Sequence, residues 1–427
     1  MAADPAAATA RPSRVRRRFI ALLVVGAIVN YLDRNTLSIA NTTIASGLRL
    51  DNIQMGLLLS AFSWPYAIAN LPAGYLVDKY GAKRLFGWAA SLWSAVTMLT
   101  AFVSSFGPLY SLRVALGIAE SPAFNAGLKV CQRWYPGRER SRAVAILGTG
   151  PQIANTIAPP LLTALLLTMT WRGMFFAVGA FGLVVAVVWA KVYRDPTPAE
   201  EAAITGTAVP ADSERVTRAV WLSLLGQPNT WFMIIGGFGI SYTVWVYLTW
   251  LPSFLQTNVG FSLKAVGAVA SLPFLCGILG VLAGGYLSAA LIRRGTRLLT
   301  ARKIPIVGGA VASATSMFPL AYAHHTVAVI ALLCIGYFFA QMPIAVAMTL
   351  ACDLAEPHQV ASLGSIQNFG GFLGAATAPL ATGVILQRTG GNYTLVFLLA
   401  GILLLMGAAV YGLFIKDPAP RPREIDV

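Results

Sequence analysis

Four charged side chains lie within stretches of sequence that otherwise have the composition of membrane-spanning helices. They are Asp33, Arg34, Arg113 and Glu120, and all four belong to the first half of the chain. A charge at the centre of a bilayer costs at least about 2.5 kcal/mol, so residues of this kind usually line a hydrated path and carry function. Two acids and two arginines in one half of the chain predict a proton-binding site beside a site for an anion.

Asp33 and Arg34 lie deep in the first hydrophobic stretch. Asp33 follows Arg18 by 15 residues, which is roughly 22 Å along a helix that rises 1.5 Å per residue. Neighbouring residues on a helix point about 100° apart, so these two side chains are poorly placed to pair with each other. Each therefore needs another partner or a water-filled cavity.

Arg113 and Glu120 can supply such partners from the fourth hydrophobic stretch. They are seven residues apart and share a helix face about two turns from each other, which is too far for direct contact unless both side chains bend inward or water bridges them. Gly117 and Ala119 are small enough to admit a neighbouring helix or water. A buried acid beside cations can titrate near neutral pH. The alternative is a static ion-pair cluster, and the absence of charges at this depth in the second half argues against it.

The composition of the chain is that of an integral membrane protein. Of 427 residues, 57% are hydrophobic and 11% charged, and the mean hydropathy is +0.69, whereas soluble domains carry about a quarter charged residues. Spans of about 20 apolar residues can be placed twelve times. The predicted spans are 18–44, 52–77, 85–104, 107–129, 141–168, 172–192, 229–255, 265–291, 303–323, 326–350, 359–386 and 394–415.

The distribution of basic residues predicts the orientation of the chain. All but six of the 31 lysines and arginines fall in the N-terminal tail, the loops after even-numbered spans and the C-terminal tail. This asymmetry follows the positive-inside rule and places both termini in the cytoplasm, with the protein in the inner (plasma) membrane. The net charge of +15 therefore reflects topology, and a nucleic-acid partner is excluded. The exceptions are Arg34 and Arg113 within spans, and Arg49, Arg172, Lys264 and Arg388 on the other side.

A polar stretch at 193–217, rich in proline and acids, divides the spans into two sets of six. Gly-Tyr-Leu at 74–76 recurs at 285–287, a weak repeat that supports two related halves, the usual organisation of secondary transporters. The predicted fold class is an all-α membrane protein with two pseudo-symmetric six-helix bundles. The predicted boundaries are 1–17 for a cytoplasmic tail, 18–192 for the first bundle, 193–217 for a cytoplasmic linker, 218–416 for the second bundle and 417–427 for a cytoplasmic tail.

The loop after the second span gives the first family resemblance. Residues 74–84 (Gly-Tyr-Leu-Val-Asp-Lys-Tyr-Gly-Ala-Lys-Arg) resemble the signature of the major facilitator superfamily between helices 2 and 3. The resemblance implies a gating role for Asp78 and Arg84, which would latch one conformation of a carrier; Lys79 and Lys83 could equally be ordinary positive-inside charges. The second half has Ala289 at the place of Asp78, so a latch there must be weaker or differently built.

Motifs on three spans resemble a narrower group, the anion:cation symporter family. They are 31–34 (Tyr-Leu-Asp-Arg) with 37–40 (Leu-Ser-Ile-Ala), 60–66 (Ser-Ala-Phe-Ser-Trp-Pro-Tyr) with 71–74 (Leu-Pro-Ala-Gly), and the pair Arg113 and Glu120 before Pro122. This family includes bacterial carriers for galactonate, glucarate and hexuronates. The resemblance to this family is dense in the first half of the chain and loose in the second half.

The resemblance implies roles for individual residues. Asp33 and Glu120 would bind protons, and Arg113 would tune Glu120. Arg34 would bind the substrate carboxylate, since a guanidinium offers a permanently charged, bidentate fork. The further substrate contacts would be Tyr31 and Tyr66 through their hydroxyls, Gln152 and Asn155 through their amides, and Asn368 in the second half. Apart from the resemblance, Tyr242 lies three residues before Trp245 in an aromatic span and could also face the cavity. The amides Gln152 and Asn155 could equally join helices to each other. Where several sugar-acid members have an aromatic residue on helix 10, this chain has Ala347.

The sequence thus predicts a proton-coupled importer of a small organic anion, with sugar acids (aldonates, aldarates or hexuronates) the favoured class, working by alternating access as a monomer. An exporter of drugs or organic cations is the alternative, but it would need unpaired acids and not an arginine beside Asp33. A facilitator or a receptor fits less well. No nucleophile–base pair or metal-ligand spacing is present, so we expect neither an enzyme nor a metal site, and no cofactor beyond the proton gradient.

Overall fold

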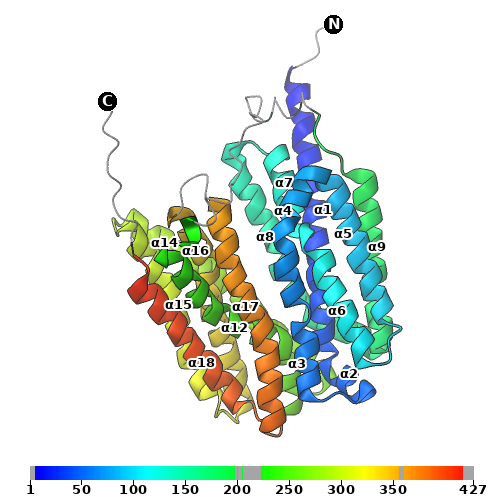
Figure 1. The fold of residues 1–427 in the computed structure, drawn as a ribbon, viewed down its shortest axis with the longest axis vertical. Helices are drawn as coiled ribbons and strands as arrows, with labels where there is room; N and C mark the ends of the chain where they lie inside the picture. Colours follow the sequence, from blue (N-terminus) through cyan, green and yellow to red (C-terminus); the bar gives the residue numbers. More distant parts are fainter. Residues whose placement is uncertain (1–4, 198–199, 201–203, 205–222, 355–359, 417–427) are drawn as a thin grey trace. The chain divides into compact units, whose positions relative to one another are not determined.

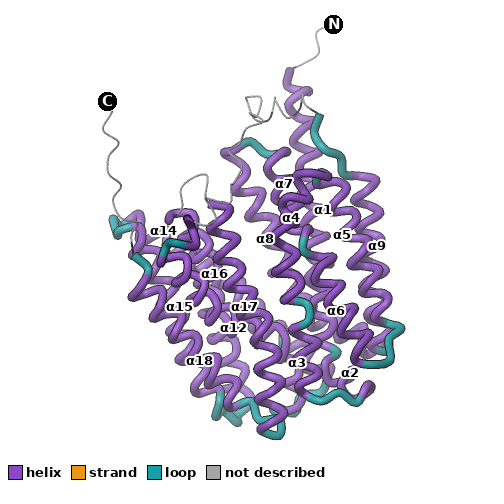
Figure 2. Tube along the Cα trace, viewed as in Figure 1, coloured by secondary structure: helices purple, strands orange, loops and turns teal. Residues whose placement is uncertain are grey.

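The computed structural model consists of helices and connecting loops, with no strand among the residues it describes (Figures 1 and 2). These residues are 5–197, 200, 204, 223–354 and 360–416. The extreme tails and most of the expected linker 193–217 lie outside them. The predicted boundaries of tails, bundles and linker stay a prediction.

The helices of the first half follow the predicted hydrophobic stretches closely. They are α1 (Pro5–Ile39), α2 (Asn41–Leu48), α3 (Asn52–Ser60), α4 (Ser63–Tyr80), α5 (Ala82–Thr100), α6 (Phe106–Glu120), α7 (Pro122–Trp134), α8 (Gly137–Thr168) and α9 (Trp171–Val192). Those of the second half are α12 (Pro228–Thr257), α13 (Leu263–Val269), α14 (Ser271–Arg293), α15 (Leu298–Leu320), α16 (Thr326–Leu354), α17 (Val360–Arg388), α18 (Thr394–Ala409) and the short π-helix η1 (Val410–Phe414).

Besides the first predicted span, in which α1 ends at Ile39 and α2 begins at Asn41, three predicted spans are each built from two helices. The breaks fall between α3 and α4, α6 and α7, and α13 and α14. In every case the second helix carries a proline within its first three residues: Pro65, Pro122 and Pro273. Proline lacks an N–H and is accommodated in the first turn of a helix, where that donor would have no partner. The breaks place Phe62 and Glu120 at helix ends.

Six of the described helical segments are long and apolar enough to cross a membrane by length and composition. The segments are Trp171–Val192, Pro228–Thr257, Leu263–Arg293, Thr326–Leu350, Ile366–Arg388 and Thr394–Phe414. Many large apolar side chains along such helices are exposed, including Phe181, Leu282 and Leu413. An apolar exterior of this kind suits contact with lipid.

The chain forms two compact units. Unit 1 comprises Met1–Ser213, Val246–Phe274 and Ala376–Tyr393; unit 2 comprises Glu214–Trp245, Leu275–Ala375 and Thr394–Val427. Within unit 1, α1 packs on α8 and α9, α5 packs on α9, and α4 packs on α6 and α7. Within unit 2, α15 packs on α16 and α18.

Unit 1 contains a close approach of backbones from distant parts of the sequence. A Cβ atom added to Gly56 on α3 would lie 2.7 Å from the backbone oxygen of Pro379 on α17, and one added to Gly383 would meet the backbone oxygen of Asn52. Side-chain bonds reinforce the contact between first-half and second-half segments, since Thr42 Oγ1 donates to Gln256 Oε1 at 2.8 Å. Only glycine allows the two helices to lie so close.

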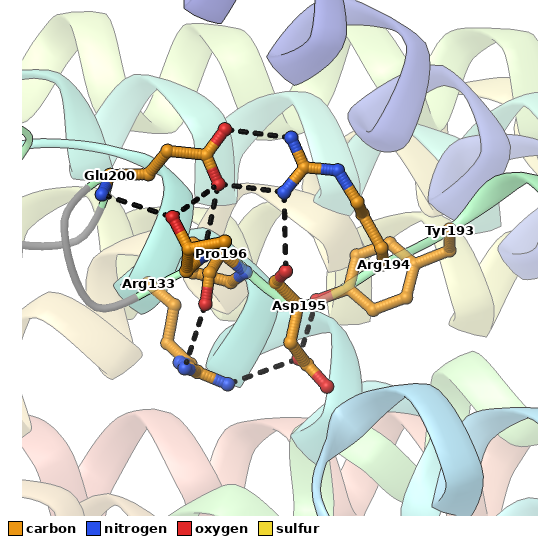
Figure 3. Close-up of polar contacts among 7 residues, drawn as sticks. Arg133, Tyr193, Arg194, Asp195, Pro196 and Glu200 are labelled. Carbon is orange, nitrogen blue, oxygen red and sulfur yellow. Dashed lines mark hydrogen bonds and ion pairs between the residues drawn. The ribbon is translucent and has the colours of Figure 1, made fainter.

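A polar cluster holds the chain after α9 against α7 in unit 1 (Figure 3). Asp195 accepts an ion pair from Arg133 at 3.1 Å and a hydrogen bond from the Tyr193 hydroxyl at 3.2 Å. Burial, with the Asp195 carboxylate beside it, raises the pKa of Tyr193, so its hydroxyl stays protonated and can donate. Arg194 forms a two-pronged pair with Glu200, with distances of 2.6 and 2.7 Å. The start of the expected linker is thus anchored to the helices that precede it.

Candidate functional site

The charged residues of unit 1 meet around one ion pair. Nε of Arg34 on α1 donates to Oε2 of Glu120, the last residue of α6, at 2.7 Å. The Glu120 side chain is fully buried, and that of Arg34 is 10% exposed. The partner that Arg34 needed therefore comes from the fourth predicted span. Arg34 donates to Glu120 through Nε alone. The two terminal nitrogens of its guanidinium, which form the fork, are therefore not hydrogen-bonded to Glu120.

Three aromatic rings surround the Arg34 guanidinium. Its Cζ lies 4.4 Å from the ring centroid of Tyr31, 4.6 Å from that of Phe62 and 4.8 Å from that of Tyr66. Contacts of this length are attractive because the face of an aromatic ring is negative. The structure thus brings Tyr31 and Tyr66 to Arg34, as their selection predicted, but it is their rings that contact the cation. Phe62 is not among the contacts predicted from the sequence.

Phe62 reaches this position because α6 comes very close to the junction of α3 and α4. A Cβ atom on Gly117 of α6 would meet the backbone oxygen of Phe62. The predicted role of Gly117, to admit a neighbouring helix, agrees with this contact. The signal that could have identified Phe62 is its spacing of four residues from Tyr66, which places both rings on one helix face.

Asp33 and Arg113 are the other two charged residues buried in this part of unit 1. Asp33 is fully buried and Arg113 is 4% exposed. In the part of the chain that the structure describes, neither carboxylate oxygen of Asp33 meets hydrogen-bond geometry with a partner, nor does Nε of Arg113. The nearby Thr97 hydroxyl on α5 is also buried and meets no such geometry. Buried polar groups without partners cost free energy, which makes this region a candidate functional site.

The two amide candidates on α8 lie near this site. Asn155 is 6% exposed, and its side-chain oxygen accepts from Nδ2 of Asn35 at 3.0 Å. Nδ2 of Asn35 also donates to the Tyr31 backbone oxygen at 2.7 Å. Asn155 therefore joins α8 to α1, one of the two roles that the sequence left open for it. Gln152 lies one turn earlier and is partly exposed.

The two gating candidates lie at the junction of α4 and α5. Asp78 falls in α4, and its side chain lies outside the described part of the structure. Arg84 is exposed in the first turn of α5. Gly81 between the helices has a φ of +81°, a conformation that glycine adopts without strain. The role of Asp78 and Arg84 as a latch therefore stays a prediction.

Unit 2 contains a cavity with a volume of about 250 Å³. Ser241 of α12 and Asn368 of α17 contribute polar groups to its wall, and Ala347 and Met348 of α16 contribute apolar ones. Asn368 is exposed, as a candidate binding residue should be. Tyr242 is 2% exposed and packs near Phe238, with ring centroids 6.2 Å apart, so Ser241 and not Tyr242 lines the cavity. Among the described residues that line it, none is charged.

With this geometry established, comparison with known proteins decides the family. A model of the Major Facilitator Superfamily matches residues 23–301 and 297–426. The chain belongs to the Major Facilitator Superfamily. The predicted fold class, an all-α bundle of twelve transmembrane helices, is confirmed. This superfamily member is a multi-pass membrane protein.

Several curated relatives of this superfamily member are named as transporters of sugar acids. It is 36% identical over 423 residues to the "Probable L-galactonate transporter" of Escherichia coli (strain K12), with 97% of this chain and 92% of that protein covered. It is 32% identical over 428 residues to the "Probable galactarate/D-glucarate transporter GarP" of the same strain, with 94% and 96% covered. It is 27% identical over 405 residues to the "Hexuronate transporter" of Bacillus subtilis (strain 168), with 94% and 95% covered.

These relatives confirm the expected resemblance to bacterial sugar-acid carriers. Family and relatives are transporters, so the protein is a transporter and not an enzyme, as expected. A solved structure supports the fold alone: a bacterial homologue of the human lysosomal transporter Spinster matches with a TM-score of 0.79 and 16% identity. That match covers 93% of this chain and 96% of the other.

Proposed function

We propose that this transporter imports a sugar acid together with protons by alternating access. The observation that carries the proposal is the pair of Arg34 and Glu120 at 2.7 Å. A substrate carboxylate requires a cation, and at membrane depth the Arg34 guanidinium already has an acid beside it. The names of the relatives, which specify galactonate, galactarate, glucarate and hexuronate, support the choice of a sugar acid.

Competition for Arg34 would couple the proton to the substrate. When Glu120 is ionised, it holds Nε of Arg34 and opposes a second anion at the same guanidinium. When Glu120 takes up a proton, its charge is lost, and Arg34 can offer its bidentate fork to the substrate carboxylate. Release of the proton on the other side of the membrane restores the ion pair and expels the anion.

Asp33 and Arg113 would form the second part of the proton machinery. Asp33 is a buried carboxylate whose nearest cations are arginines on α1 and α6. Arg113 lies electrostatically within reach of both Asp33 and Glu120, so a proton on one acid changes the field at the other. We assign proton binding to Asp33 and Glu120, and the coupling between them to Arg113.

The remaining candidates would either contact the uncharged part of the substrate or stabilise one conformation of the carrier. Tyr31 and Tyr66 hold Arg34 through their rings and could present hydroxyls to the anion, while Gln152, Asn155, Tyr242 and Asn368 would contact hydroxyl groups. Asp78 and Arg84 would act as a latch. The close approach of α3 and α17 at Gly56 and Gly383 supports alternating access, since a contact that only glycine permits can form and separate as one side closes and opens. We place the protein in the inner membrane as a monomer with both termini inside.

The experiment is uptake into proteoliposomes with an imposed inward proton gradient. Labelled galactonate should accumulate with the wild-type protein and fail to accumulate with Asp33→Asn or Glu120→Gln, while exchange without a gradient is retained. Glu139→Gln is the matched control, because it removes a half-exposed acid outside the membrane core. Undiminished accumulation in both core variants rejects the proton assignment. Proton-driven efflux of organic cations would instead support an exporter.

A further inference from the structure

Thr97 on α5 has a buried hydroxyl that its own helix does not satisfy. A threonine within a helix commonly turns its hydroxyl onto the backbone oxygen three or four residues earlier. Thr100, one turn further along α5, does so, since its Oγ1 donates to the Val96 backbone oxygen at 3.0 Å. Thr97 is 2% exposed, and its Oγ1 meets hydrogen-bond geometry with no group in the part of the chain that the structure describes. This hydroxyl is therefore available to a neighbour outside α5.

Packing around α9 places Asp33 at the level of Thr97 within unit 1. A Cβ atom added to Gly182 of α9 would contact both Ser94 Oγ of α5 and Val29 Cγ1 of α1, so these two side chains meet at one level. Asp33 lies one turn after Val29, and Thr97 lies one turn after Ser94. The helices α1 and α5 correspond to the first and third predicted spans, which cross the membrane in the same direction. One turn beyond their common contact, Asp33 and Thr97 are therefore neighbours, and the Thr97 hydroxyl is among the groups that act on the Asp33 carboxylate.

The charged groups around Asp33 come from two helices. They are Arg34 on its own helix, with Arg113 and Glu120 on α6. The charged residues in α5, α8 and α9 lie within two turns of a helix end. Lys129 of α7 is half-buried and lies nine residues beyond Glu120, about two and a half turns along a helix. The arginines favour the ionised form of Asp33 through their charge, but among the described residues neither carboxylate oxygen meets hydrogen-bond geometry with a donor.

Resting on the proposed function, in which Asp33 binds protons, we infer that Thr97 is a positioning residue of the proton site, whose hydroxyl donates a hydrogen bond to the Asp33 carboxylate when that group loses its proton. A threonine in a helix has two accessible side-chain rotamers, so the hydroxyl can turn without any movement of α5. A hydrogen bond to the charged form of an acid favours that form. Thr97 thereby sets the pH range in which the carrier takes up and releases its proton.

The test is the pH dependence of exchange of labelled galactonate in proteoliposomes with equal pH on both sides. The substrate carboxylate stays ionised from about pH 5 to about pH 9, so a loss of exchange with rising pH reports deprotonation of the carrier. Thr97→Val keeps the shape of the side chain and removes the hydroxyl. The pH of half-maximal exchange should rise by about one unit, because losing a hydrogen bond to an ionised carboxylate changes its proton affinity roughly tenfold. Thr97→Ser retains the hydroxyl and should restore the wild-type midpoint.

Two controls separate an effect through Asp33 from a structural one. Thr100→Val removes a buried hydroxyl of the same helix that is bonded to its own backbone, and it should leave the midpoint unchanged. In an Asp33→Asn background, adding Thr97→Val should not move the pH profile, because the acid on which Thr97 acts is gone. A purely structural role would lower the rate at every pH without moving the midpoint.

The outcomes distinguish this inference from the proposed function. An unmoved midpoint in Thr97→Val would overturn the inference and leave the proposed function intact, provided that Asp33→Asn abolishes gradient-driven accumulation. Thr97→Ala, which also lacks the hydroxyl, serves the same test if the valine variant does not fold. A shift that persists in the Asp33→Asn background would mean that Thr97 acts on another group, which also overturns the inference. Undiminished accumulation in Asp33→Asn would overturn the role of Asp33 in the proposed function, and the inference with it.

Discussion

Arg34 and Glu120 form an ion pair at 2.7 Å in which the acid is fully buried and the arginine nearly so. The pair joins the last turns of α1 to the end of α6, across 86 positions of sequence. Such a pair gains little net stability over apolar residues of the same shape, but breaking it leaves a buried charge. A buried pair of this kind in unit 1 therefore suits a contact with a role in transport better than one that only stabilises the fold.

The first prediction concerns the cost of separating this pair. Arg34→Gln leaves the Glu120 carboxylate buried without its cation, and at pH 8 we expect the variant to lose about 3 kcal/mol of stability. The double variant Arg34→Gln with Glu120→Gln removes both charges and should recover most of that loss. Thermal unfolding of the purified proteins in detergent measures both effects. Equal melting temperatures for the single and double variants would show that the pair contributes no coupling.

The second prediction separates the rings around Arg34 from their hydroxyls. Phe62→Leu removes one aromatic face from the guanidinium, worth about 1 kcal/mol, and should raise the KM for the sugar acid roughly fivefold. Tyr66→Phe retains the ring and removes only the hydroxyl. If the hydroxyl contacts the substrate, this variant also raises KM; if Tyr66 acts through its ring alone, KM stays unchanged.

The third prediction concerns the contact between α3 and α17. Gly383→Ala would place a methyl group against the Asn52 backbone oxygen, which cannot yield without moving a helix. We expect at least a tenfold loss of transport, although alanine has the higher helix propensity by about 1 kcal/mol. Gly285→Ala is the control, since its Cβ would meet nothing within 4 Å.

A cross-link reports whether this loss comes from separation of the helices. Cysteines at Thr42 and Gln256, whose Oγ1 and Oε1 atoms are 2.8 Å apart in the structure, should be joined by a short bifunctional thiol reagent in a background without the native cysteines. Adding Gly383→Ala should lower the yield. An undiminished yield would mean that the loss of transport has another cause.

The fourth prediction concerns the anchor formed by Arg133 and Asp195 (Figure 3). Asp195→Asn keeps the shape of the side chain and removes its charge, which weakens the 3.1 Å pair with Arg133. Both side chains are partly exposed, so the expected loss is about 1 kcal/mol, seen as a melting temperature roughly 1 °C lower in a chain of this length. Lys191→Gln, which removes an exposed charge nearby, should change it little.

The sequence predicts which residues belong to this site better than it predicts how they are arranged. Hydropathy and charge depth identify Asp33, Arg34, Arg113 and Glu120, because a charge in a span is rare whatever the tertiary structure. The pairing of Arg34 with Glu120 depends on the depth at which α1 meets α6, and periodicity along one helix carries no such information. Ser241 and not Tyr242 lines the unit 2 cavity, a difference of one residue that equals about 100° around α12. Only packing against Gly371, whose added Cβ would lie 3.0 Å from Ser241 Oγ, fixes that rotation.

The fifth prediction is a pH dependence at Glu200. The paired guanidinium of Arg194, followed by the backbone N–H of Thr197, lowers the pKa of Glu200 to about 2 from an ordinary 4.5. A depressed carboxyl pKa contributes stability that is fully present above the unfolded value and is lost as the pH falls towards the folded value. The melting-temperature difference between wild type and Glu200→Gln should therefore be constant above about pH 5 and shrink as the pH falls from 4.5 towards 2. A difference that grows on acidification would contradict the paired state, because protonation of Glu200 can only remove its bond to Arg194.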